Sequence, residues 1–271
     1  MPTTKIWQVD AFTDRPFGGN PAAVCLLEQF PSDTWMRNLA AEINLSETAF
    51  LVRQGANEYH LRWFTPLAEV ELCGHATLAS AHVLKEQKQV ETTEPIQFNT
   101  LSGQLLCHVD DEMLTLNFPA TPAERELKVD ELNSLSAALG VDCPEAWANQ
   151  YDVLVRVESR QALDAMRPNF QLMSELEYRG VITTCEPGAN EQVDFVSRFF
   201  APRVGVPEDP VTGSAHCTLA PYWARILGKN DVRGFQASKR GGYVDCNVQQ
   251  DRVELCGQAV TVLKCKLLVG R

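Results

Sequence analysis

The apolar positions of the chain follow two periods, and the shorter one predicts strands. Residues 58–65 alternate Tyr59, Leu61 and Trp63 with more polar neighbours, as a strand with one buried face does. Comparable stretches rich in β-branched and aromatic residues predict further strands at 5–12, 46–52, 95–100, 103–109, 113–120, 152–157, 180–185, 193–200, 241–248, 252–257 and 259–269.

The longer period predicts helices. In residues 32–45, apolar side chains recur at helical spacing after Ser32, which is typical of an N-cap. Residues 130–140 form a second such pattern, and 74–84 and 213–228 predict two helices of mostly small and apolar side chains. Turn-forming residues predict a loop at 17–24, around Asn20-Pro21, and a linker that begins at Phe118.

A repeated pattern links the two halves of the chain. Arg62 and Arg198 each begin the sequence Arg-aromatic-Phe-x-Pro, and each segment runs through a short loop into Gly-x-Ala and a small-residue helix. Gly74 thereby matches Gly213, and the second loop is three residues longer. Two strand–loop–helix units in opposite halves indicate two similar domains.

The matched glycines suit the binding of an anion. Glycine lets the backbone approach a ligand closely, and the first N–H groups of a helix are unsatisfied and carry partial positive charge. Two such helix starts facing each other would hold one small carboxylate across a cleft between domains. The alternative is that both glycines only end loops before buried helices, but the matched lead-in strands favour the binding site.

Composition limits the classes of partner. The 271 residues carry 24 Lys and Arg against 35 Asp and Glu, a net charge of −11, with 45% hydrophobic residues. This is the composition of a globular protein, and its negative charge disfavours nucleic acid and membrane surfaces as partners. No secretory signal or membrane-spanning run is evident, so we expect a cytoplasmic protein.

The nine cysteines predict neither a disulfide framework nor a zinc site, since they are widely spaced without a C-x-x-C motif. The histidines show no metal spacing, and no nucleotide or cofactor motif is present, so we expect no cofactor and no metal. Cys73 precedes Gly74 at a helix start, where its thiol pKa is expected to be lowered. The matching position in the second copy holds Thr212, which disfavours a two-cysteine mechanism.

Three groups with proton chemistry lie near the glycines. His75 follows Gly74, Asp209 precedes Gly213 in the altered loop, and Glu47 begins a predicted strand. Two acid/base groups on opposite sides of a substrate could move a proton from one carbon to another. Each also has a structural interpretation: Glu47 as a surface residue, His75 as a core histidine, and Asp209 with the following proline as a turn.

Four blocks together resemble the PhzF family of phenazine biosynthesis-like proteins: residues 8–24, 44–51, 61–79 and 198–216. The likeness runs from about residue 5 to the C-terminus and is strongest to the branch that contains the mammalian members. It implies an α+β, diaminopimelate-epimerase-like fold with two pseudo-symmetric domains, each wrapping a barrel-like sheet around a central helix. It places the domains at 1–117, completed by a strand near 258–271, and at 118–257.

The resemblance also implies a function, often in a homodimer. The founding enzyme is a cofactor-free isomerase that moves a proton within a small cyclic amino-acid-like carboxylate. Residue by residue, the resemblance makes Glu47 the catalytic carboxylate, with His75 and Asp209 lining the substrate. It makes Gly74, Gly213 and Ser214 backbone and hydroxyl donors to the substrate.

Two alternatives stay open. The chain could be an adaptor that keeps the enzyme fold and binds a protein partner, which an exposed apolar patch or a Glu47 turned away from Gly74 would favour. A weaker alternative is a cysteine-dependent racemase that uses Cys73.

Overall fold

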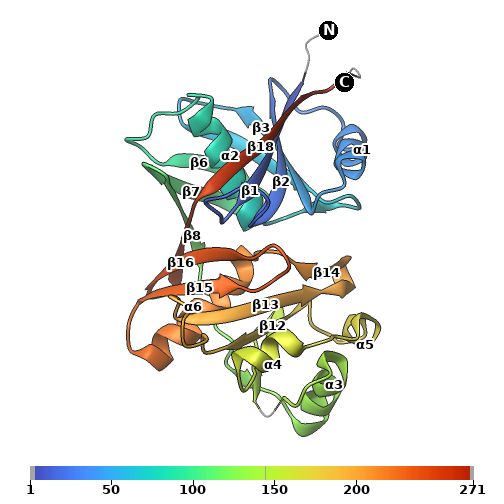
Figure 1. Cartoon of the computed structure of the whole chain (residues 1–271). Coiled ribbons are helices and arrows are strands. Elements are labelled where there is room, and N and C mark those ends of the chain that lie inside the picture. Colours follow the sequence, from blue (N-terminus) through green and yellow to red (C-terminus); the bar gives the residue numbers. More distant parts are fainter. Residues whose placement is uncertain (1–3, 144, 269–271) are drawn as a thin grey trace. The chain divides into compact units, whose positions relative to one another are not determined.

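The computed structural model, which describes residues 4–143 and 145–268, divides into two compact units. Unit 1 comprises Met1–Asn117 and Cys256–Arg271, and unit 2 comprises Phe118–Leu255 (Figure 1). The structure therefore assigns the last strand of the chain to the same unit as the first. The end of the expected strand 259–269, residue 269, and residues 269–271 of the segment 258–271 lie outside the described residues.

The sheet of unit 1 mixes parallel and antiparallel neighbours. β1 (Lys5–Ala11) lies antiparallel between β18 (Ala259–Lys266) and β2, and β2 is parallel to β3. β3 pairs antiparallel with β4, β4 is parallel to β6, and antiparallel pairing continues through β7 to β8. The remaining bounds are β2 Asn20–Leu27, β3 Glu47–Arg53, β4 Glu58–Phe64, β5 Glu69–Val70, β6 Ile96–Thr100, β7 Gly103–Asp110 and β8 Met113–Pro119.

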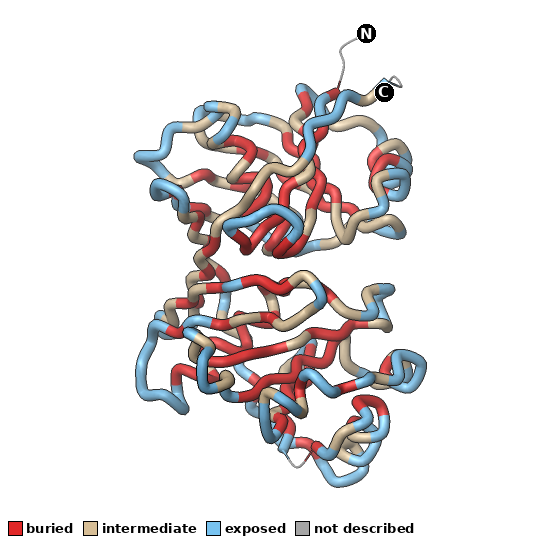
Figure 2. Tube along the Cα trace, in the orientation of Figure 1, coloured by how far each residue is buried: buried red, intermediate tan, exposed pale blue. Residues whose placement is uncertain are grey.

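This sheet curls around one helix, α2 (Gly74–Glu86). α2 contacts β1, β2, β3, β7 and β18, so strands from both ends of the pairing order reach it (Figure 1). Its small side chains allow that enclosure, and nearly every position of its first three turns is buried (Figure 2). The other helix of the unit, α1 (Asp33–Ile43), begins at the predicted N-cap Ser32 and packs Met36, Leu39 and Ala40 against the outer face of the sheet.

Unit 2 repeats the order of strand directions. β11 is parallel to β12, β12 antiparallel to β13, β13 parallel to β15, and β15 antiparallel to β16. Its strands are β9 Arg125–Glu126, β10 Ala146–Ala148, β11 Asp152–Arg156, β12 Gly180–Cys185, β13 Phe195–Ala201, β14 Val206–Asp209, β15 Asp231–Gln236, β16 Gly242–Gln249 and most of β17 (Arg252–Gly257), whose last two residues belong to unit 1.

One helix of unit 2 corresponds to α2. α6 (Gly213–Leu227) contacts β11, β15 and β16, and it is buried along most of its length. Three shorter helices cover a separate hydrophobic cluster on the other side: α3 (Val129–Leu139), α4 (Arg160–Ala165) and α5 (Phe170–Ser174). The duplicated pattern in the sequence thus corresponds to duplicated connectivity.

The repeat extends to one ion pair in each unit. Arg62 donates to both carboxylate oxygens of Glu69 at 2.7 and 2.6 Å, and Arg198 donates to those of Glu208 at 2.7 and 3.1 Å. The first pair is seven residues apart and the second ten, so the extra three residues lie before Glu208, where a 3₁₀ turn (Pro202–Val204) forms. Each pair fixes a lead-in strand against the turn that reaches the helix.

One local prediction was wrong in part. The pattern at 17–24 predicts a loop around Asn20-Pro21, yet Asn20 begins β2 and Pro21 stands opposite Asp10, so only the first three residues of that segment, 17–19, lie outside the strand. The predicted linker begins where unit 2 begins, at Phe118, and it contains the end of β8 and the short β9. Of the helices that the structure describes, none has the length and hydropathy needed to cross a bilayer.

Candidate active site

The predicted residues Glu47, Gly74 and His75 come together in unit 1. Glu47 is the first residue of β3 and His75 the second residue of α2, and Oε2 of Glu47 lies 3.1 Å from Nε2 of His75. The Glu47 side chain is 15% exposed and that of His75 6%. The two atoms are at ion-pair distance without the alignment of a hydrogen bond, as is common in catalytic pairs before substrate tightens them.

Two side chains hold the other nitrogen of the ring. Nδ2 of Asn20 lies 3.2 Å from Nδ1 of His75, and Sγ of Cys73 lies 3.6 Å from the same atom. All three residues are buried. The imidazole is thus bounded by a carboxylate on one nitrogen and by an amide and a thiol on the other.

The environment of His75 favours its charged form. Burial opposes the charge, but Cys73 and Glu47 outweigh it and raise the pKa of the imidazole well above its usual range. Burial also raises the pKa of the Cys73 thiol to about 11, so near neutral pH the negative charge acting on the ring comes from Glu47. The predicted lowering of the Cys73 pKa was wrong, because desolvation of the thiolate exceeds the effect of the helix start.

Glu47, Cys73 and His75 also supply the oxygen, sulfur and nitrogen donors that metal ions bind, with one atom of each within 4.8 Å of the others. The ring, however, turns Nδ1 to the thiol and Nε2 to the carboxylate. A single ion could not bind all three without a rotation of the imidazole, so these groups are better suited to passing a proton.

The remaining predicted residues, Asp209, Gly213 and Ser214, lie in unit 2 around the start of α6. Oγ1 of Thr212 donates to Asp209 at 2.5 Å, and Gln236 donates to the Asp209 carbonyl at 2.7 Å. Asp209 follows Glu208 as Val70 follows Glu69, so it stands at the repeat position of a valine and outside the inserted residues. The sequence favoured Asp209 because it lies in the longer loop of the repeat, but the extra residues of that loop come before Glu208 and do not include Asp209.

Sequence reasoning missed a charged group beside Ser214. Arg179 donates to both carboxylate oxygens of Asp152, one at 2.9 Å, and to Oγ of Ser214 at 3.1 Å. Asp152 is only 2% exposed. Ser214 stands at the repeat position of His75, so unit 2 presents a hydroxyl and a guanidinium where unit 1 presents an imidazole and a carboxylate.

The two helix starts share one further property. The N-cap residues Cys73 and Thr212 make no side-chain cap hydrogen bond to α2 and α6. The first amides of each helix therefore keep the unsatisfied character that suits an anionic ligand.

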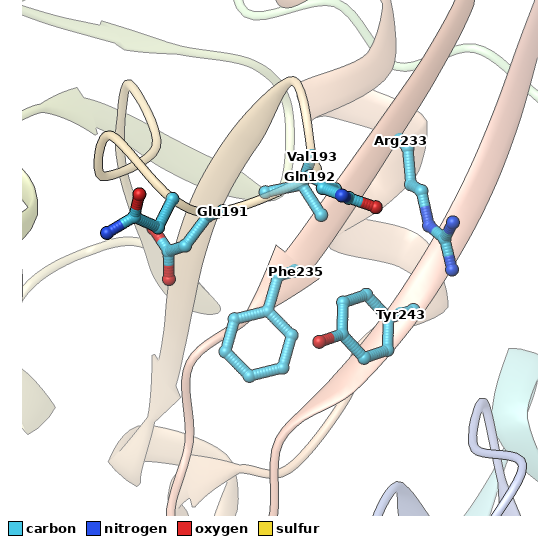
Figure 3. A pocket seen from close by; sticks show the side chains of 7 residues that line it. Glu191, Gln192, Val193, Arg233, Phe235 and Tyr243 are labelled. Atoms are coloured by element: carbon cyan, nitrogen blue, oxygen red, sulfur yellow. The ribbon is translucent and has the colours of Figure 1, made fainter.

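A pocket of about 360 Å³ opens elsewhere on unit 2 (Figure 3). The rings of Phe235 and Tyr243 lie side by side in it, 4.8 Å between centroids, with the Arg233 guanidinium 5.1 Å from the Tyr243 ring. Its carboxylate, Glu191, accepts hydrogen bonds from the Gly188 amide and from Arg160. Burial of Glu191 is outweighed by these bonds, which lower its pKa. This carboxylate fixes a loop and is poorly suited to proton transfer.

Comparisons with known proteins agree with this architecture. Residues 9–265 match the profile of the family described as "Phenazine biosynthesis-like protein" (PhzC-PhzF). An uncharacterized isomerase of Halalkalibacterium halodurans is 49% identical over 269 residues, covering 99% of this chain and 100% of the relative. Phenazine biosynthesis-like domain-containing protein 2 of Mus musculus is 42% identical over 280 residues, covering 96% and 97%.

A solved structure gives the same result for the fold. The crystal structure of a PhzF-family phenazine biosynthesis protein from Enterococcus faecalis superposes with a TM-score of 0.92 at 39% identity, covering 99% of this chain and 100% of that one. The predicted α+β, diaminopimelate-epimerase-like fold is thereby confirmed.

Proposed function

The chain belongs to the PhzC-PhzF family of phenazine biosynthesis-like proteins, and on that premise we propose that it is a cofactor-independent isomerase or epimerase that moves a proton on a small carboxylate. The main support is the contact between Glu47 and His75 at the start of α2. A carboxylate and an imidazole at ion-pair distance, both largely buried, can exchange a proton with a substrate carbon near neutral pH. The isomerase name of the Halalkalibacterium relative supports the same class of reaction.

In this proposal Glu47 is the general acid/base and His75 relays or stabilises the proton. A proton abstracted next to a carboxylate leaves an enolate-like charge, and backbone N–H groups aimed at that charge stabilise it by several kcal/mol in many enzymes. The uncapped amides from Gly74 onward are placed to do so. Asp209 of unit 2 is proposed to orient the substrate or relay the proton, as His75 does, and Gly213 and Ser214 are proposed as substrate-binding residues, where Arg179 also contacts Ser214.

The geometry bears on the two alternatives. The adaptor hypothesis expected Glu47 to be turned away from Gly74, whereas its carboxylate meets the residue that follows Gly74. A cysteine-dependent racemase needs a thiolate, and a Cys73 pKa of about 11 leaves that group protonated near neutral pH. Both observations support acid/base catalysis by side chains other than cysteine.

The test is deuterium incorporation from heavy water into a panel of small cyclic amino-acid-like carboxylates, followed by mass spectrometry. We expect the wild-type protein to exchange a carbon-bound hydrogen of at least one compound. Glu47→Gln keeps the shape of the side chain and should reduce exchange by roughly 100-fold or more. The matched control is Glu42→Gln, at an exposed position of α1. Undiminished exchange by Glu47→Gln would falsify the role of Glu47 as the proton carrier.

A further inference from the structure

Asn20 approaches His75 from the side opposite Glu47. It is fully buried, it is the first residue of β2, and its Nδ2 lies 3.2 Å from Nδ1 of the ring. β2 and β3 are parallel, with Ala22 opposite Glu47. Two neighbouring strands therefore begin beside the start of α2, and each directs its first side chain at a different nitrogen of one imidazole.

The backbone before Asn20 is shaped to place it there. Gly19 has a left-handed φ of +58°, and a Cβ on Gly19 would lie 2.1 Å from the carbonyl oxygen of Ala11. The turn is also tied from within the unit, since the Phe17 amide donates to Oδ2 of the buried Asp10 at 2.7 Å. A side chain at residue 19 would move the start of β2, so the position of the Asn20 amide is specified by the fold.

An amide is suited to a histidine that changes charge. Its nitrogen can only donate and its oxygen can only accept. With the nitrogen toward the ring, Nδ1 accepts, and the proton of a neutral imidazole is placed on Nε2, toward Glu47. With the amide turned over, the oxygen accepts from the Nδ1–H of an imidazolium. An aspartate carboxylate can only accept, so it would pair with the cation or with the neutral ring protonated on Nδ1, and leucine would pair with neither form.

We propose that Asn20 is a positioning residue that holds His75 by Nδ1 in both charge states of the ring, so that Nε2 stays directed at Glu47 throughout proton transfer. The effect of Asn20 on catalysis rests on the proposed function, whereas its effect on the orientation and protonation of the His75 ring does not. The titratable groups that face His75 are Glu47 from β3 and Cys73 beside it on the start of α2. A protonated thiol is a weak partner, so the amide is the principal constraint on Nδ1.

The first measurement needs no substrate. In protein labelled with ¹⁵N-histidine, long-range ¹H–¹⁵N spectra report the tautomer and pKa of each of the five histidines, and His75→Gln assigns the relevant signals. At alkaline pH we expect wild-type His75 to be neutral with its proton on Nε2. Asn20→Asp should keep the ring doubly protonated to higher pH, and Asn20→Leu should give signals averaged between tautomers. Asn38→Asp, which adds the same charge at an exposed position of α1, should change neither.

The second measurement is the pH dependence of deuterium exchange. Asn20→Leu should lower kcat by roughly tenfold or more with little change in KM, and Asn20→Asp should shift the pH profile in parallel with the His75 titration.

The proposal is overturned if wild-type His75 carries its proton on Nδ1, or if folded Asn20 variants leave its signals unchanged. If Asn20→Asp does not fold, the tautomer of His75 in the wild type and the His75 signals of Asn20→Leu still test the proposal. If the wild type exchanges nothing while these variants alter His75, the proposed function fails and the positioning role stands.

Discussion

Gly180 occupies in β12 the position that Glu47 occupies in β3. Thr48 pairs with Phe64 and Val181 pairs with Phe200, and these two phenylalanines are the matched residues of the repeated lead-in strands. The residue before each paired position is Glu47 in unit 1 and Gly180 in unit 2. The duplicated fold therefore carries the Glu47–His75 contact in one copy and a glycine beside Arg179 in the other.

Gly180 cannot readily accept a side chain. A Cβ at this position would lie 2.3 Å from Cζ of Phe199, and Phe199 is buried on the paired strand β13. We expect Gly180→Ala to lower the free energy of unfolding by about 1–3 kcal/mol through overpacking. Chemical denaturation measures the change, and Gly180→Ala combined with Phe199→Leu should recover part of it. An alanine variant as stable as the wild type would show that this contact is not tight.

Thiol reactivity provides the next prediction. Of the nine cysteines, Cys265 is exposed, Cys256 is partly buried, and the others are buried. A disulfide reagent at pH 8 should therefore modify Cys265 quickly and Cys73 only at the rate of unfolding, because burial raises the Cys73 pKa to about 11. Cys265→Ser should remove the fast phase, whereas Cys73→Ser should keep it and retain deuterium exchange. Rapid modification of Cys73 in the folded protein would restore the cysteine-dependent alternative.

The buried carboxylate of Asp152 depends on Arg179. Arg179→Met removes the cation and leaves a nearly inaccessible charge without its guanidinium partner. Since Arg179 itself is 38% exposed, we expect a loss of about 2–3 kcal/mol in the free energy of unfolding, below the full effect of breaking a buried pair. Lys229→Met, which breaks an ion pair with Asp194 whose lysine side chain is 48% exposed, should change stability by less than about 1 kcal/mol. Equal effects of the two variants would contradict this account.

The sequence predicted much of this fold because its strongest signals are local. The amphipathic helix after Ser32 and the small-residue helices after Gly74 and Gly213 depend on periodicity and on the spacing of glycines, and the structure confirms them. The Asn20-Pro21 pair is typical of turns and predicts a loop, whereas the strand conformation of Asn20 is imposed by the pairing of β2 with β1. Arg179 and Asp152 were missed for a similar reason, since only the parallel pairing of β11 with β12 brings them together.

His216 makes the stability of the protein sensitive to acid. It is fully buried in α6, its Nδ1 lies 2.8 Å from the Thr212 carbonyl oxygen, and burial lowers the pKa of its ring to about 4. Above about pH 6.5 the ring is neutral in both the folded and the unfolded chain, so it contributes nothing to the pH dependence. As the pH falls below that value, the unfolded chain takes up a proton that the folded chain refuses, and the free energy of unfolding decreases.

The loss should reach about 3 kcal/mol near pH 4, where the folded ring begins to protonate as well. His75 acts in a different window, because its raised pKa makes stability fall as the pH rises above about 6.5. We therefore compare urea unfolding of the wild type and of His216→Gln between pH 7 and 4. The variant should be less stable at pH 7 and should lose less stability on acidification, whereas His108→Gln, at an exposed site on β7, should follow the wild type. If His216→Gln loses as much stability as the wild type, the acid sensitivity arises from the carboxylates instead.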